Sequence, residues 1–218
     1  WDWEVAENHL RRAVELAPND ADAHIYLAHL HSNLARKQEA LAHARRATQL
    51  NPVSPLIGAL EGQFLGLQGE HEAALQRLKE VISLEPSFWL SHHLLAIAMI
   101  DAGQPEASLE ESVEAKRLSP LQTYSDSMMA VALARLGRTD EAAAILKSLT
   151  AAARDTYVPP YHLALIEMAL GNHDAAIAQL EAALTVRDVR IVYLKIDPKW
   201  DGLRSDPRFQ SAMRQVGF

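Results

Sequence analysis

The stretch Gly69-Glu-His-Glu-Ala-Ala-Leu-Gln-Arg-Leu-Lys-Glu-Val-Ile-Ser-Leu-Glu-Pro86 combines a helical pattern with two helix-end signals. Apolar residues recur through it at the spacing of one helix face, which predicts an α-helix. Gly69 suits the left-handed position at which a preceding helix ends. Pro86 cannot continue a helical hydrogen-bond ladder, so it marks the end of the helix that this stretch forms.

The same signals return every 34 residues along the chain. The proline series is Pro18, Pro52, Pro86 and Pro120, and the glycine series is Gly69, Gly103, Gly137 and Gly171. Small residues keep the same step at Ala28, Gly62, Ala96, Ala130 and Ala164. Small side chains let two packed helices approach closely, whereas bulky ones would hold them apart. The period therefore predicts stacked pairs of antiparallel helices.

This period divides the chain into predicted units. Residues 1–20 supply only the second helix of a truncated repeat. Five repeats follow at 21–54, 55–88, 89–122, 123–156 and 157–190, and residues 191–218 are expected to form a C-terminal capping segment. A cap is expected because a stack of repeats exposes an apolar face at each end.

The capping segment carries two signals for a helix start. Asp197-Pro198 and Asp206-Pro207 each place an N-cap residue before a proline at the first helical position. The second of these helices is expected to run from about residue 207 to residue 215. We expect its apolar stripe, together with two apolar residues that precede it, to pack on the last repeat; these residues are Trp200, Leu203, Phe209, Met213 and Val216.

The chain resembles the tetratricopeptide repeat family, whose units have 34 residues and the same small-residue and proline positions. The resemblance implies an all-α, right-handed superhelical solenoid, with first helices lining a concave groove and second helices forming the convex back. Residues 1–20, 157–165 and 192–209 also look like the C-terminal arrays of bacterial signalling and transcription-regulator proteins. Because the chain begins at Trp1 rather than Met, we expect a fragment with an effector domain upstream.

The family pattern implies which side chains of the first helices face the groove. The ligand-binding candidates are Ile25, His29, Asn33, Gln63, Leu90, His93, Ile97, Ser127, Val131, Tyr161 and Leu165. This set carries no formal charge, so it predicts a largely neutral, apolar groove that suits a peptide or protein segment. The aliphatic members have a second interpretation, packing between repeats, because helical apolar spacing is first of all a core signal. We expect no recognition of a C-terminal carboxylate, because the family's set of Lys, Arg and Asn is absent.

The predicted function is that of a non-catalytic scaffold or sensor module for protein–protein interaction, with a protein or peptide as partner. The alternative is a self-associating structural module, a homo-oligomer formed through the groove or through an open N-terminal edge. That edge would expose Trp1, Trp3 and Leu10, because residues 1–20 lack their first helix. An enzyme built on histidines and carboxylates is the third, least favoured interpretation.

The composition argues against several other classes of protein. The net charge of −7 disfavours a nucleic-acid partner, which would require a basic surface. The chain has no Cys, and its ten histidines lack the spacing of a metal site, so we expect no metal and no cofactor. No catalytic residue is expected, because no nucleophile elbow or phosphate loop occurs. The longest apolar run, Leu94 to Ile100, is too short for membrane insertion. We expect a cytoplasmic location, with the periplasm as the alternative.

Overall fold

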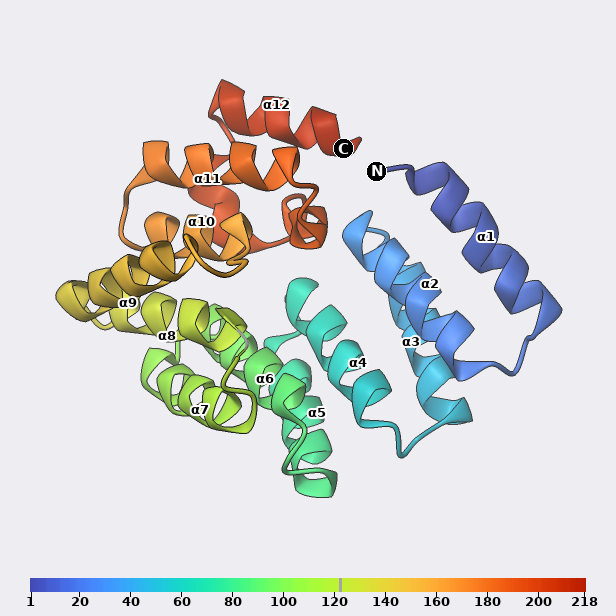
Figure 1. Cartoon of the computed structure of the whole chain (residues 1–218). Coiled ribbons are helices and arrows are strands. Elements are labelled where there is room, and N and C mark those ends of the chain that lie inside the picture. The colour runs from blue at the N-terminus through green and yellow to red at the C-terminus, as the bar shows by residue number, and fades with distance from the viewer. Residues whose placement is uncertain (122) are drawn as a thin grey trace.

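The computed structural model describes residues 1–121 and 123–218, and these residues form an all-α solenoid of antiparallel helix pairs, as expected (Figure 1). The helices of the truncated unit and the repeats are α1 (Trp3–Leu16), α2 (Ala21–Asn33), α3 (Lys37–Leu50), α4 (Pro55–Leu67), α5 (His71–Leu84), α6 (Trp89–Asp101), α7 (Pro105–Leu118), α8 (Thr123–Arg135), α9 (Thr139–Ala152), α10 (Pro160–Ala169) and α11 (His173–Thr185). The C-terminal segment adds two short 3₁₀ helices and a final α-helix, namely η1 (Val189–Tyr193), η2 (Pro198–Leu203) and α12 (Pro207–Val216).

Local sequence signals set where these helices begin and end. Asp20 caps α2 by accepting hydrogen bonds from two main-chain N–H groups, and Ser54 caps α4 in the same way through one. The four glycines of the 34-residue series all have positive φ angles, between 73° and 83°. Ala35 occupies the equivalent turn after α2 and adopts the same left-handed region, with φ 63°. The left-handed turn is therefore kept at Ala35 although a Cβ atom makes it less favourable.

One helix departs from the regular step. The earlier first helices begin at residues 21, 55, 89 and 123, whereas α10 begins at Pro160 rather than at Tyr157. Residues 157–160 read Tyr-Val-Pro-Pro, and a residue that precedes proline is disfavoured in the helical region. The delay of three residues leaves α10 with ten residues, the shortest helix of the repeats described here.

Two glycines of α4 bring this helix close to α5. A Cβ atom on Gly62 of α4 would lie 2.6 Å from the Leu78 side chain of α5, and one on Gly58 would lie 2.6 Å from Val81. Real Cβ contacts are longer than this, so these positions require glycine unless the helices separate. The close packing of α4 on α5 follows from these two residues.

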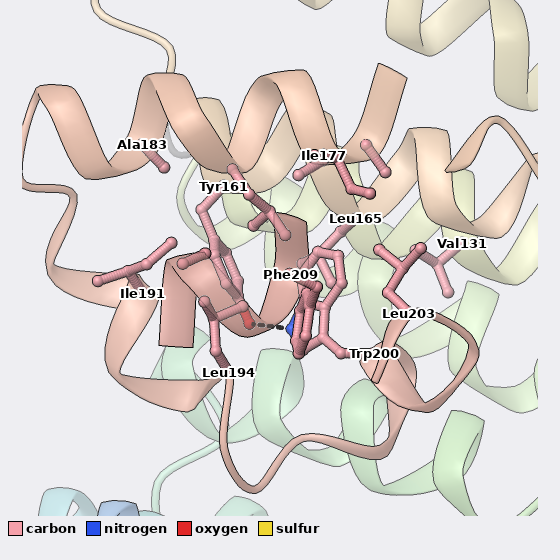
Figure 2. Packing of buried hydrophobic residues seen from close by; sticks show 14 of the residues in the cluster. Val131, Tyr161, Leu165, Ile177, Ala183, Ile191, Leu194, Trp200, Leu203 and Phe209 are labelled. Atoms are coloured by element: carbon pink, nitrogen blue, oxygen red, sulfur yellow. Dashed lines mark hydrogen bonds between the residues drawn. The ribbon is translucent and has the colours of Figure 1, made fainter. Parts of the chain in front are cut away.

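The C-terminal segment packs on the last repeat through the predicted residues (Figure 2). Trp200 is fully buried and its Nε1 donates to the Tyr161 hydroxyl at 3.2 Å. Leu203 and Phe209 join the same cluster, with Met213 half-buried at its edge. The two predicted N-caps are confirmed, because Asp197 and Asp206 each accept a main-chain hydrogen bond at the start of η2 and α12. The first of these helices is 3₁₀ rather than α.

The solenoid curves until its two ends meet (Figure 1). The indole Nε1 of Trp3 in α1 donates to the carbonyl oxygen of Val216 in α12, and the ring stacks on Phe218 with centroids 5.1 Å apart. Trp3 was expected at an open edge, and its ring is instead covered by the C-terminus. Trp1 beside it stays 40% exposed.

Candidate functional site

A cavity of about 610 Å³ lies on the inner side of the solenoid. Its walls come from the first helices of the repeats and from the C-terminal segment that crosses their inner face. The lining residues are His29 (α2); Leu60, Gly62, Gln63, Gly66 and Leu67 (α4); Trp89, Leu90, His93, Leu94, Ile97, Ala98 and Asp101 (α6); Tyr124, Ser127 and Met128 (α8); Tyr161, His162 and Leu165 (α10); and Val189, Arg190, Val192, Tyr193, Asp197 and Lys199. The cavity therefore joins residues from His29 in α2 to Lys199 in η2.

Most of the predicted groove residues line this cavity. They are His29, Gln63, Leu90, His93, Ile97, Ser127, Tyr161 and Leu165. Ile25 instead packs fully buried against Ala28 and Ile57, and Val131 lies in the C-terminal core cluster. These two aliphatic residues follow the interpretation of packing between repeats. Asn33 is buried at the end of α2, away from the lining.

Aliphatic and aromatic side chains form most of the wall. Leu90 and Ile97 both come from α6, and Leu165 comes from α10. The rings of Trp89, His93 and Tyr124 form a connected group, with centroids 5.2 to 6.1 Å apart. Tyr124 also contacts the His162 ring at 4.5 Å. The resulting surface is apolar, with aromatic rings from three successive first helices.

The 3₁₀ helix η1 lines another part of the cavity. The Tyr193 hydroxyl forms a 3.0 Å hydrogen bond with Nε2 of His29, a residue 164 positions earlier in the chain. Burial lowers the pKa of His29 to about 4 and raises the pKa of Tyr193 to about 12. A neutral imidazole therefore meets a protonated phenol at pH 7. Nearby, the Arg190 guanidinium lies 4.1 Å from the centre of the Tyr124 ring, a cation–π contact.

A buried ion cluster lines part of the cavity. The Lys199 ammonium lies 2.9 Å from an Asp101 carboxylate oxygen and 3.2 Å from one of Asp197. Burial lowers the pKa of Lys199, but the two carboxylates raise it by more, so the net direction is upward and the side chain stays charged. Burial raises the pKa of Asp101. With Arg190, the lining holds two cations and two carboxylates, so it is neutral in sum although it contains charged groups.

His93 is a polar residue of the wall with an unsatisfied ring nitrogen. The residue is only 5% exposed, and its Nδ1 atom is buried without a hydrogen bond to the residues that the structure describes. Burial lowers the pKa of His93 to about 3, with a smaller contribution from the nearby cations Lys199 and Arg190. The imidazole is therefore neutral at pH 7, with one donor and one acceptor nitrogen.

Sequence reasoning missed the residues that the C-terminal segment contributes. Arg190 is the final residue of the last predicted repeat, and Tyr193 and Lys199 follow it. All three lie after α11, and their place in the cavity depends on how this part of the chain folds back. Tyr124, which lies 34 residues after the predicted groove residue Leu90, is a groove position of the family pattern and lines the cavity.

Two further observations concern the described residues. Across residues 1–121 and 123–218, no group of three or more His, Asp or Glu side chains is placed to hold a metal ion. Among these same residues, every helix is too short or too polar to cross a membrane.

Comparisons with known protein families identify the repeat. Family models described as tetratricopeptide repeat match residues 2–55, 124–147 and 161–188. One curated relative, the protein O-mannosyl-transferase Tmtc2 of Drosophila melanogaster, is 39% identical over 70 residues. That alignment covers 32% of this chain and 8% of the length of the relative.

Solved structures show the same fold. TTC0263, a thermophilic TPR protein of Thermus thermophilus, aligns with a TM-score of 0.63 and 24% identity, covering 89% of this chain and 100% of that one. PilF of Pseudomonas aeruginosa aligns with a TM-score of 0.60 and 20% identity, covering 98% and 90%. A MamA fragment from Desulfovibrio magneticus RS-1 gives 0.58 and 20%, covering 72% and 88%.

Proposed function

Because this chain is an array of tetratricopeptide repeats, we propose that it is a non-catalytic interaction scaffold or sensor module that binds a peptide or protein segment on its concave face. Tetratricopeptide folds are typical of protein–protein interaction scaffolds. The observation that supports the concave face is the cavity of about 610 Å³, whose apolar walls come from successive first helices. This volume falls within the roughly 300–1,000 Å³ of ordinary ligand pockets.

The chemistry of the walls favours a segment with apolar side chains. Leu90, Ile97 and Leu165 offer aliphatic surface that a bound side chain would remove from water. The charged groups at the cavity are already paired with one another, so a partner gains little from bringing further charge. The eight predicted groove residues that line the cavity are the proposed contact set.

Selection from a displayed library of random peptides tests the proposal. We expect peptides with apolar anchors to be enriched, and the variant Ile97→Glu to weaken their binding at least roughly tenfold, because an unpaired carboxylate would enter an apolar wall. Val113→Glu is the matched control, since Val113 is half exposed on the second helix α7. Circular dichroism checks that both variants fold. Failure to enrich any peptide, or equal binding by Ile97→Glu, would contradict the proposal.

The wider context is proposed from the sequence resemblance. We propose that the array is part of a larger bacterial signalling or regulatory protein and works in the cytoplasm, with the periplasm as the alternative. The gene sequence upstream of Trp1 tests this, since a winged-helix, kinase or cyclase domain is expected there. An upstream segment without an effector domain would contradict it.

Self-association is the alternative function. The structure weakens one of its premises, because the C-terminus covers Trp3 at the N-terminal edge. Val5 and Leu16 on α1 remain exposed, so the edge still offers apolar surface. Sedimentation velocity over a range of concentrations separates the two functions: the scaffold proposal expects a monomer without partner, and the alternative expects an oligomer.

A further inference from the structure

We infer that the cavity accepts a neutral aromatic side chain that carries a hydrogen-bond donor, a Tyr or Trp of the bound segment. The claim that the anchor belongs to a protein segment rests on the proposed function. The chemistry of the anchor rests on the walls of the cavity alone, so the two claims can fail separately.

The walls favour an aromatic anchor by shape and composition. Trp89, His93 and Tyr124 present rings from α6 and α8, and Ile97 and Leu165 provide aliphatic surface beside them. A ring entering among these residues gains apolar burial and edge or offset contacts with other rings. The volume of about 610 Å³ is large enough for a phenol or indole group with part of its backbone.

The charges at the cavity favour a neutral anchor. Arg190 lies over the Tyr124 ring and is paired with Asp188 at 3.0 Å, and the Asp188 side chain is fully buried. Lys199 likewise lies between Asp101 and Asp197, at 2.9 and 3.2 Å. A cationic anchor would meet these two cations, and the carboxylates beside Lys199 already share its charge. An anionic anchor would find both cations already neutralised. Either would lose its hydration without a free counter-charge.

Two polar side chains of the wall, each with one buried atom that lacks a partner, favour an anchor with a donor. His93 Nδ1 has no hydrogen-bond partner among the described residues, and Gln63 Oε1 is buried without one. Buried polar groups without partners are uncommon in folded proteins. The Gln63 oxygen is an acceptor, and a neutral imidazole has one acceptor nitrogen. Small side-chain adjustments of either residue would let a phenol O–H or an indole N–H supply the missing donor.

Side-chain analogues test this chemistry on the full chain without a known partner. Isothermal titration calorimetry would compare p-cresol, 3-methylindole, toluene, n-butylammonium and propionate. We expect p-cresol and 3-methylindole to bind roughly fivefold tighter than toluene, because each adds one hydrogen bond to a buried acceptor. The two ions are expected to show no binding at concentrations that saturate p-cresol. Stronger binding of an ion, or equal binding of toluene and p-cresol, would overturn the inference.

Variants place the binding in the cavity. His93→Leu and Gln63→Met each remove one of the two candidate acceptors. At least one of these variants is expected to lose the preference for p-cresol over toluene while it still binds toluene. Ile97→Trp is expected to fill the cavity and remove binding of every analogue. His9→Leu is the matched control, since His9 is exposed on α1. A preference for p-cresol that survives both His93→Leu and Gln63→Met would overturn the inference.

The peptide selection distinguishes the two claims. Enrichment of Tyr or Trp anchors supports both. Enrichment of aliphatic or charged anchors alone overturns this inference and leaves the proposed function standing. Binding of p-cresol with no enriched peptide would identify a free aromatic molecule as the ligand. That result would overturn the inference that the aromatic group belongs to a Tyr or Trp of a bound segment.

Discussion

The indole Nε1 of Trp3 donates a hydrogen bond of 2.6 Å to the main-chain carbonyl of Val216, which lies 213 positions later in the chain. The ring also stacks on Phe218, and the Lys195 ammonium lies 5.2 Å from the centre of the Phe218 ring. Contacts in a repeat array normally join only neighbouring repeats, so its two ends are independent. Here the first helix contacts the C-terminal end of the chain through Trp3, and this contact restrains the curvature of the array.

Removal of the Trp3 ring should therefore loosen the ends of the array. We expect Trp3→Ala to lower the free energy of unfolding by about 2 kcal/mol, less than a fully buried aromatic residue because Trp3 is half-buried. Energy transfer between dyes on α1 and α12 should fall at the same time. Trp1→Ala, on the more exposed neighbour, is the control. Unchanged energy transfer in Trp3→Ala would show that the ends do not depend on this contact.

The buried ion cluster makes Lys199 a sensitive position. Lys199→Met should lower the free energy of unfolding by about 3–5 kcal/mol, because it leaves Asp101 and Asp197 buried without their cation. Urea denaturation measures the change. Lys37→Met removes an exposed pair with Glu70 and should cost less than about 1 kcal/mol.

A double variant separates the two parts of that loss. Adding Asp101→Leu to Lys199→Met removes one of the stranded carboxylates, so part of the stability should return. A double variant that is less stable than the sum of the two single changes would contradict an electrostatic origin.

The repeats could be predicted from the sequence because their signals are local and recur. Gly69 and its three equivalents end first helices, and Asp206 begins α12, through rules that need no tertiary information. The 34-residue step also placed most of the cavity residues. It failed at α10, where Pro159 and Pro160 shift the helix start by a local rule that the period conceals.

The composition of the cavity could not be predicted in full, because it depends on contacts between residues far apart in the sequence. Tyr193 reaches His29, and Lys199 reaches Asp101, only once the whole array has curved. None of the eleven ligand-binding candidates carries a formal charge. The structure instead has a cavity with two paired cations, and both of these come from the part of the chain after α11.

Glu7 links α1 to the next repeat and predicts a stability loss in acid. Burial raises the pKa of Glu7, but hydrogen bonds and charge from Arg36 and Arg11 outweigh it and hold the pKa at about 2, below the ordinary value of 4.5. The stabilisation is therefore fully present above pH 4.5 and disappears as the pH falls toward 2. We expect it to be about 1 kcal/mol, because both arginines are 40% or more exposed and solvent screens the pairs.

Comparison of Glu7→Gln with the unmodified chain in urea at pH 7 and pH 2.5 measures this contribution. The difference in free energy of unfolding should be present in full at pH 7 and fall to about a quarter of that at pH 2.5. Glu15→Gln, which removes an exposed pair with Arg12, should show little difference at either pH. A Glu7 effect that is the same at both pH values would exclude an ionic origin.

His93 predicts a stability loss at milder acid, for a different reason from Glu7. Glu7 stabilises the fold in its charged form, whereas the fold keeps His93 in its neutral form. Burial lowers the pKa of His93 from the ordinary value of 6.5 to about 3, so below pH 6.5 the unfolded chain binds a proton that the folded chain excludes. The folded state therefore loses stability as the pH falls from 6.5 toward 3, and by pH 5 the loss from His93 is about 2 kcal/mol.

His93→Leu removes this titration, and the Nδ1 atom lost with it has no hydrogen-bond partner within the described residues. Relative to the unmodified chain, His93→Leu should thus be about 2 kcal/mol more favourable at pH 5 than at pH 8. His9→Leu, at an exposed position, should show no such difference. A His93→Leu effect that is independent of pH would show that folding does not shift the pKa of His93.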